Sequence, residues 1–235
     1  NNFIISALLN SNSTVYVIDG DKMVGDEGSS DVYNELCSLG ASLKIALNRS
    51  DIIHFIREVF LSYISRKKQN EHDAIFIVIK NLQFLDIVKS MLKGENIDES
   101  DYVDTPTKEP EIDLSDPFAS VNNMFSNSIS SENMSTGEKL IKLIDDGSGF
   151  GIYFVVTSLE YQTVRESMYY GENVLSKFPE RIIFSLNSND ADNLVDNVSV
   201  TGLKDNTVYY TDGVKNTFQL KPYISPKAHE LKLIF

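Results

Sequence analysis

The chain has 235 residues, 42% of them hydrophobic, which is enough for a substantial core. Its formal net charge is −13, and Lys and Arg form no basic stripe, so the composition argues against nucleic-acid binding. Cys37 is the only cysteine, which excludes a disulfide framework and a thiolate metal cluster. Apolar runs stay well short of the about 18 residues that span a bilayer. We therefore expect a soluble α/β piece in which residues 1–235 form one domain.

Acidic residues are concentrated in one segment near the middle of the chain. Residues 95–116 contain nine acidic residues and one base, Lys108, and the same segment is interrupted by prolines. Residues 120–135 are rich in Ser and Asn. Such composition does not form a packed core, and we expect 95–135 to be a mobile, acidic insertion. A solvated loop is favoured here over an acidic binding tail.

The first half of the chain alternates helical and strand patterns. We predict, in chain order, a helix over 3–9, a strand over 14–18, a helix over 31–39, a strand over 42–47, a helix over 50–68 and a strand over 74–79. The last of these has six consecutive apolar residues, four of them β-branched. This pattern is typical of a strand that is buried on both faces in the middle of a parallel sheet.

The second half begins with a strong helix signal. The sequence Ser135-Thr136-Gly137-Glu138 is a capping box and predicts a helix through Ile144, followed by a buried strand over 152–157. We then predict a helix over 165–175, a strand over 181–186 and a short helix over 190–195. The segments 207–210 and 217–220 read as a β-hairpin that closes the sheet edge. The expected fold is α/β, a mostly parallel sheet flanked by helices with a C-terminal β-hairpin.

Known catalytic and metal-binding motifs are missing. The glycines Gly20 and Gly25 have the spacing of a phosphate-binding P-loop, but acidic residues follow them, and acid would repel phosphate. The alternating glycines of 147–151 sit between a helix and a strand, which indicates a turn. No histidines share a metal-ligand spacing, and no serine lies in a Gly-x-Ser-x-Gly elbow. The sequence therefore predicts neither a catalytic residue nor a metal site.

A resemblance to a known family extends this interpretation. Five segments in order are similar to the RecA-like motor domain of the FtsK/SpoIIIE translocases: 17–23, 63–67, 75–81, 151–158 and 181–184. Within that group the acidic charge and the ending 220–224 look most like a C-terminal ATPase domain of the EssC/EccC family, and of its EssC-like branch. Members of this family are the membrane-anchored coupling proteins of type VII secretion systems.

The resemblance implies a RecA-like P-loop NTPase fold and specific positions for its nucleotide site. It places Lys80 and Asn81 where the Walker B Asp and Glu belong, Thr157 at the end of the sensor strand, and Arg181 at the start of the next strand. The P-loop would precede Phe3. We expect a degenerate site of Lys80, Asn81 and Thr157 that holds ATP weakly, and Mg²⁺ poorly, because an ammonium repels the metal.

The role of Lys80 and the function of the chain both have alternatives. Lys80 either contacts a phosphate directly or, the interpretation we favour, extends from the strand end to the surface. The resemblance implies the cytoplasmic domain of a cell-membrane-anchored protein that recognises secreted substrates with helical signals, contacts neighbouring ATPase domains of the same chain and forms a hexamer. The main alternative is a working ATP-hydrolysing translocase domain whose P-loop lies outside this sequence and whose catalytic acids are supplied elsewhere, for example by Asp19 or Asp86. DNA translocation is a third possibility, disfavoured by the charge.

Overall fold

The computed structural model describes most of the chain outside the acidic segment. The described residues are 2–9, 13–25, 30–67, 73–95, 97, 134–169, 172–187, 190, 194, 201, 203–204, 206–212, 217–222 and 226–233. The predicted insertion over 95–135 and the predicted helix over 190–195 therefore lie almost wholly outside the described residues. No helix in the described part is both long enough and apolar enough to cross a bilayer.

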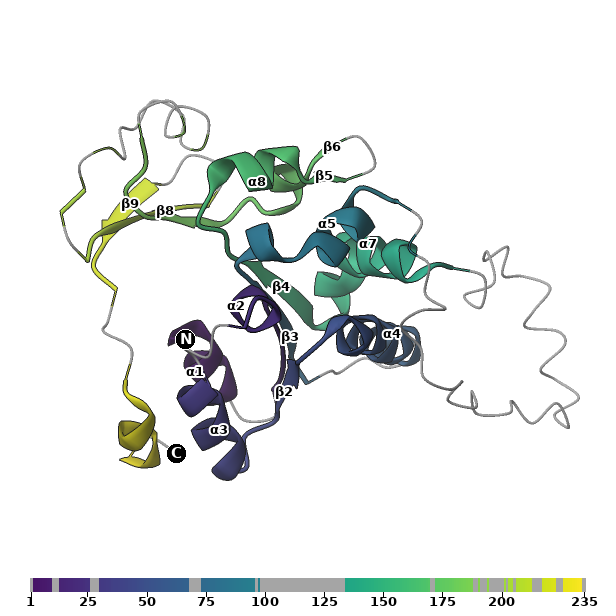
Figure 1. Ribbon diagram of the computed structural model, residues 1–235, viewed down its shortest axis with the longest axis horizontal. Helices are drawn as coiled ribbons and strands as arrows, with labels where there is room; N and C mark the ends of the chain where they lie inside the picture. Colours follow the sequence, from purple (N-terminus) through teal and green to yellow (C-terminus); the bar gives the residue numbers. More distant parts are fainter. Residues whose placement is uncertain are drawn as a thin grey trace, which may run out of the picture.

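A four-stranded parallel sheet forms the centre of the fold. Its strands are β1 (Thr14–Asp19), β2 (Leu43–Ala46), β3 (Ile75–Lys80) and β4 (Ile152–Val156), in the order β2-β1-β3-β4 (Figure 1). β3 pairs with β1 on one side and β4 on the other, and most of its side chains are buried. The prediction of a central parallel strand over 74–79 is confirmed.

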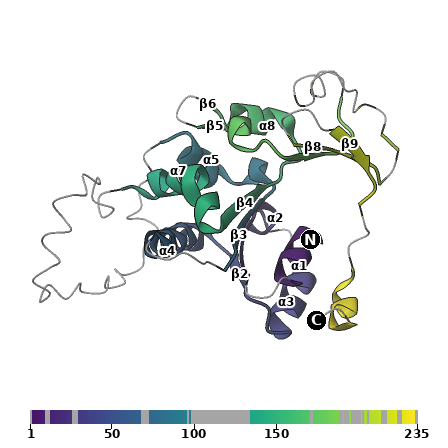
Figure 2. The ribbon, with the colours of Figure 1, turned by 180° about the vertical axis from the view of Figure 1, so that it is seen from behind.

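Helices cover both faces of this sheet. Figures 1 and 2 show α1 (Asn2–Leu9) and α3 (Ser30–Ser38) on one face, and α4 (Arg49–Arg66), α5 (Asp86–Leu92) and α7 (Thr136–Asp146) on the other. Because successive side chains of a strand point to opposite faces, the two faces have separate cores. Ile18, Ile77 and Ile79 pack with α4, α5 and α7, whereas Val15, Val17 and Val78 pack with α1 and α3.

Capping boxes begin the two long helices, α4 and α7. Ser135 and Glu138 form the box of α7, as the sequence predicts. Asn48 and Asp51 form the box of α4, which the sequence analysis does not assign. The two helices also contact each other at their C-terminal halves, where the Tyr63 hydroxyl donates to Asp146 Oδ2 at 3.1 Å. Burial, together with this hydrogen bond and the negative charge of Asp146, raises the pKa of Tyr63 to about 12.

The segment after β4 differs from the prediction. The helix α8 spans Tyr161–Glu166, and the residues that follow form a short antiparallel pair, β5 (Met168–Tyr169) with β6 (Glu172–Asn173), and a 3₁₀ turn. The predicted helix over 165–175 is therefore wrong. Ser167 ends α8, because its hydroxyl and its N–H both bond to the Thr163 carbonyl. Gly171 in the same stretch further weakens any helical preference.

The C-terminal strands form a second sheet. β8 (Val208–Thr211) and β9 (Thr217–Leu220) are the predicted hairpin, and β8 also pairs antiparallel with β7 (Arg181–Ile183). This sheet is separate from the parallel one (Figure 2), so the expectation that the hairpin closes the edge of the parallel sheet is wrong. The reason is that Ile183 packs against Leu186, Leu194, Leu203 and Tyr209, in a small core of its own.

The end of the described chain returns to the N-terminal half. A 3₁₀ segment, Ala228–Leu233, packs against α3, and Leu231 is fully buried there. Leu231 belongs to the same core cluster as Ile4 and Ile5 of α1. The first and last described segments therefore share one hydrophobic core.

Candidate functional site

The order of connections places a crevice between β1 and β3. From β1 the chain reaches β2 through α3 on one face, and from β2 it reaches β3 through α4 on the other face. The chain leaves the carboxyl end of β1 toward β2, and it leaves the carboxyl end of β3 toward β4. The connections that follow these two neighbouring strands therefore run in opposite directions. In open parallel sheets, ligands bind at such a switch point. Asp19 and Lys80 end the two strands and are register partners.

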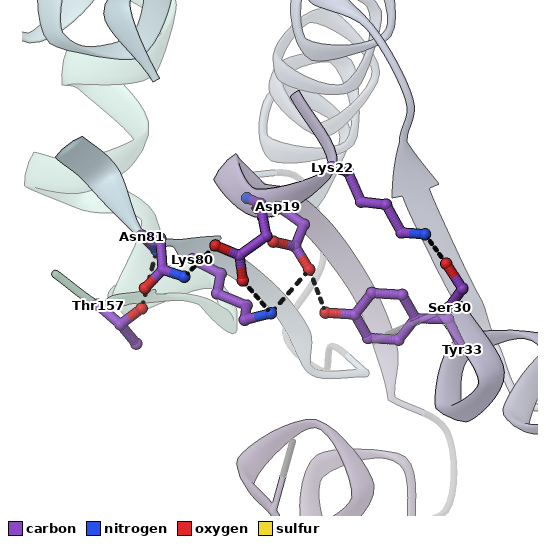
Figure 3. A network of polar contacts seen from close by, with 8 residues as sticks. Asp19, Lys22, Ser30, Tyr33, Lys80, Asn81 and Thr157 are labelled. Carbon is purple, nitrogen blue, oxygen red and sulfur yellow. Dashed lines mark hydrogen bonds and ion pairs between the residues drawn. The ribbon is translucent and has the colours of Figure 1, made fainter. Parts of the chain in front are cut away.

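An ion-pair cluster occupies this crevice (Figure 3). The Lys80 ammonium lies 3.0 Å from Asp19 Oδ2 and 2.8 Å from Asp21 Oδ2. Asp19 is fully buried, and the Lys80 side chain retains a fifth of its exposure. The ammonium therefore lies between two carboxylates rather than in solvent.

Both carboxylate oxygens of Asp19 also have partners besides Lys80. The Tyr33 hydroxyl of α3 donates to Asp19 Oδ2 at 2.7 Å, and the Asp21 N–H donates to Asp19 Oδ1 at 3.0 Å. The second bond makes Asp19 the N-cap of the short helix α2 (Gly20–Met23). A buried carboxylate needs such a set of partners, since desolvation without them is very costly.

Asn81 joins this cluster to β4. Its backbone is left-handed, with φ 56°, which Asn tolerates better than most residues. Its side-chain Nδ2 donates to Asp21 Oδ1 at 2.6 Å, and its N–H donates to Thr157 Oγ1 at 3.0 Å. The structure therefore brings the three sequence-predicted site residues, Lys80, Asn81 and Thr157, into one network.

The two charged partners hold each other in their ionised forms. Burial acts to lower the pKa of Lys80, but hydrogen bonds to Asp21 and Asp19 and their charges outweigh it, so this pKa is raised. Burial acts to raise the pKa of Asp21, and the hydrogen bonds from Lys80 and Asn81 outweigh it, so that pKa is lowered. With two carboxylates and one ammonium, the cluster carries a formal charge of −1 at neutral pH.

The structure corrects the interpretation that the Lys80 side chain extends to the surface, and its contact with a phosphate stays a prediction. Its ammonium does not extend to the surface, because it lies between two carboxylates with only a fifth of the side chain exposed. Asp19 and Asp21 together more than balance the charge of the ammonium, so a phosphate at Lys80 would also face their negative charge. Within the described ranges, no group of three or more His, Cys, Asp and Glu residues could hold a metal ion.

Gly20 allows the two strand ends to approach closely. A Cβ built at Gly20 would lie 2.5 Å from the Asn81 carbonyl oxygen and 3.0 Å from that of Lys80. Both are main-chain atoms, which cannot rotate away. Gly20 is therefore needed for the close packing of α2 on the end of β3. This packing accounts for the glycine without a phosphate-binding loop.

A groove of about 390 Å³ opens beside the cluster. It is formed by the three connections that follow β1, β2 and β3. Its lining combines apolar side chains with charged ones: Lys22, Met23, Val24, Leu47, Asn48, Arg49, Ile52, Phe84, Leu85, Asp86 and Ile87. Leu47 and Val24 are 67% and 58% exposed, which is unusual for large apolar residues in a concave surface.

The other residues that the sequence singled out have structural partners. Asp86 lies in the first turn of α5 and pairs with Lys89 at 2.7 Å. The hydrogen bond from Lys89 lowers the pKa of Asp86. Arg181 begins β7 in the second sheet and donates to the main-chain carbonyls of Phe178 and Leu194, both at 3.1 Å.

Sequence reasoning missed two members of the cluster, Asp21 and Tyr33. A signal for Asp21 was present, because Asp19-Gly20-Asp21 directly follows a predicted strand. Nothing in the sequence points to Tyr33, whose hydroxyl reaches Asp19 only through the packing of α3 on the sheet.

The fold and this site define an α/β protein in which an ion-paired cluster fills the crevice of a four-stranded parallel sheet. Comparison with protein-family models, curated proteins and solved structures found no match to the chain.

Proposed function

We propose that the chain is a degenerate FtsK/SpoIIIE-type ATPase domain of a type VII secretion coupling protein, and that it recognises and regulates export substrates rather than hydrolysing ATP. The observation that carries the proposal is the ion pairing of Lys80 with Asp19 and Asp21. It fills the crevice in which a nucleotide-binding sheet of this kind would hold phosphate and Mg²⁺.

The electrostatics of the cluster support the non-catalytic form of the proposal. Mg²⁺ would have to displace the Lys80 ammonium from both carboxylates, and phosphate would face a cluster with a net negative charge. The acids named in the alternative have partners of their own, Lys80 and Tyr33 for Asp19 and Lys89 for Asp86. This pairing favours a docking module over the working ATPase.

We expect no phosphate release above background and no heat of binding when Mg²⁺ and ATP are added to the protein. The physical reason is that Lys80, the cation of the site, is already neutralised by Asp19 and Asp21, and Mg²⁺ would have to displace it from these carboxylates. Phosphate release assays and titration calorimetry measure the two quantities. ATP turnover that rises with Mg²⁺ and is lost in the variant Asp86→Asn, which changes an exposed side chain, would contradict the proposal and favour the working ATPase.

The groove beside the cluster is the surface that we assign to substrate docking. Apolar side chains flank Lys22 and Arg49, a combination that suits the apolar face of an amphipathic helix with an acidic residue at its margin. Such helices are what the family resemblance implies as export signals. In the whole membrane-anchored coupling protein, this domain would transmit the arrival of a substrate to the neighbouring ATPase domains of the same chain. A hexameric ring of the protein would then respond to it.

Changing Leu47 to Asp should weaken binding of a helical export substrate of the same secretion system about tenfold, the factor for about 1.4 kcal/mol. The charge removes an apolar contact and repels an acidic segment. Leu159→Asp is the matched control, since Leu159 is 74% exposed against 67% for Leu47 and lies outside the groove lining. Fluorescence anisotropy with a labelled substrate distinguishes them. Equal losses in both variants would remove the groove from the proposal.

A further inference from the structure

The segment that follows β3 is hydrogen-bonded to the segments that follow both neighbouring strands. Toward β1, the Asn81 side chain donates to Asp21 Oδ1 of α2 at 2.6 Å. Toward β4, the Leu82 N–H donates to the Thr157 carbonyl at 2.9 Å, beside the bond from the Asn81 N–H to the Thr157 hydroxyl (Figure 3). A displacement of this segment would therefore disturb both of its neighbours.

A single 3₁₀ turn in this segment, Leu82–Phe84, directs three side chains to three different places. Such a turn has three residues per rotation, so successive side chains lie about 120° apart. Leu82 is fully buried in the core, whereas Phe84 lines the groove and is 42% exposed. Gln83 Oε1 accepts from the Ser158 hydroxyl at 3.1 Å and from the Leu159 N–H at 3.2 Å. The turn therefore joins the groove to the connection that follows β4.

The side-chain amide of Gln83 is only half satisfied in this position. The Leu159 N–H can only donate, so it fixes the oxygen of the amide toward the connection after β4. The Nε2 group is buried and has no hydrogen-bond partner among the residues that the structure describes. A buried donor without a partner costs free energy. This cost opposes the two bonds of Oε1, so they break more readily than those of a fully satisfied amide.

The helix that this connection leads into, α8, has few other contacts to hold it. It has six residues, none of them fully buried, and Val164 packs against the core only in part. Helices shorter than about 12 residues are marginal on their own. The Ser158 hydroxyl, which donates to Gln83, also accepts from the Glu160 N–H at 3.2 Å, directly before the helix. Because elements with few buried contacts open most easily, the docking of α8 depends on these polar contacts.

We propose that Gln83 couples the groove to α8, so that a helix bound against Phe84 holds α8 in its docked position. The bound helix would cover the exposed ring of Phe84 and fix the 3₁₀ turn, which keeps Gln83 Oε1 within reach of Ser158 and Leu159. α8 in turn contacts Val174–Lys177, the turn that leads into the second sheet. The inference rests on the proposed function, because it takes the groove as the docking surface for helical substrates.

Coupling of this kind works in both directions. A substrate that binds more tightly when α8 is docked must favour the docked position by the same factor. Leu159 contributes its main-chain N–H, and its side chain is 74% exposed. The variant Leu159→Asp keeps that N–H and therefore remains a suitable control for docking in the groove.

Hydrogen exchange followed by NMR, with and without a helical export substrate of the same secretion system, tests the coupling. Saturating substrate should slow exchange of the Leu159 N–H and of the α8 amides about fivefold, the lower end of common coupling factors. In Gln83→Met this slowing should disappear, because the new side chain offers only a weak acceptor. Gln219→Met, at an exposed glutamine of β9, is the matched control and should leave the slowing unchanged. A purely structural role of Gln83 would change exchange equally with and without substrate.

A second pair of variants tests the coupling without substrate. Phe84→Ala removes the ring that holds the turn from the groove side, so it should speed exchange of the Leu159 N–H several-fold. Phe218→Ala is the control, since Phe218 is 53% exposed on β9, and it should not change this rate. Substrate that binds without slowing exchange at Leu159 would overturn the coupling and leave the docking surface intact. Absence of binding would remove the docking surface, and unchanged exchange in Phe84→Ala would then overturn the coupling as well.

Discussion

Replacing Lys80 with Met should lower the free energy of unfolding at neutral pH by about 3–5 kcal/mol, the usual cost of removing one partner of a buried ion pair. The variant keeps a side chain of similar length but leaves the fully buried Asp19 facing Asp21 without a cation. Urea unfolding followed by circular dichroism measures the loss.

The pH dependence of this loss provides a further check. The lowered pKa of Asp21 contributes stability that is present above its ordinary value of 3.8 and is lost as the pH falls through the value in the folded state. The difference between wild type and Lys80→Met should therefore shrink in acid. Lys142→Met is the control, since Lys142 forms an exposed pair with Asp146 and should cost less than about 1 kcal/mol. A similar loss in both variants would contradict the buried cluster.

Gly20→Ala is the second change with a large expected effect, about 3 kcal/mol or more of stability. The added methyl group would lie 2.5 Å from the Asn81 carbonyl oxygen, so the end of β3 or the start of α2 would have to move. Lys80 and Asn81 lie at that strand end, and the displacement would also weaken their contacts with Asp21.

Gly149→Ala is the matched control for this change. A Cβ at Gly149 meets nothing within 4 Å, so the substitution should be neutral or stabilise the protein by less than about 1 kcal/mol. Thermal unfolding of the two variants in parallel compares them directly. Equal stability of Gly20→Ala and wild type would mean that α2 and β3 are not in close contact.

The parallel sheet and its principal helices could be predicted because their signals are local. β3 is a continuous apolar run, α7 begins with a capping box, and α4 repeats apolar residues at helical spacing. α5 was not predicted, although its apolar residues Ile87, Val88, Met91 and Leu92 follow the same helical spacing.

The segments after β4 were harder to predict, because their structure depends on contacts between distant residues. β7 was correctly expected to be a strand, but its sequence does not say whether its neighbour is β4 or β8. That choice depends on where Ile183 packs, and its partners Leu186, Leu194 and Leu203 make a small separate core. Local patterns do not carry this information.

The candidate site was predictable in part for the same reason. Lys80 and Thr157 end strands that were both expected to be buried and parallel, and the ends of such strands meet at one edge of a sheet. The pairing of Lys80 with Asp19 required the order of the strands, which the sequence leaves open. The contribution of Tyr33 required the packing of α3 as well.

The burial of Leu231 in one core with Ile4 and Ile5 affects how the chain folds during synthesis. The helix α1 leaves the ribosome before the other described elements, but the core on its face of the sheet is completed only when Leu231 has emerged as well. Contacts between residues so distant in sequence carry a large loop-closure cost and tend to form late. Until then, apolar surface of α1 and α3 stays accessible to chaperones.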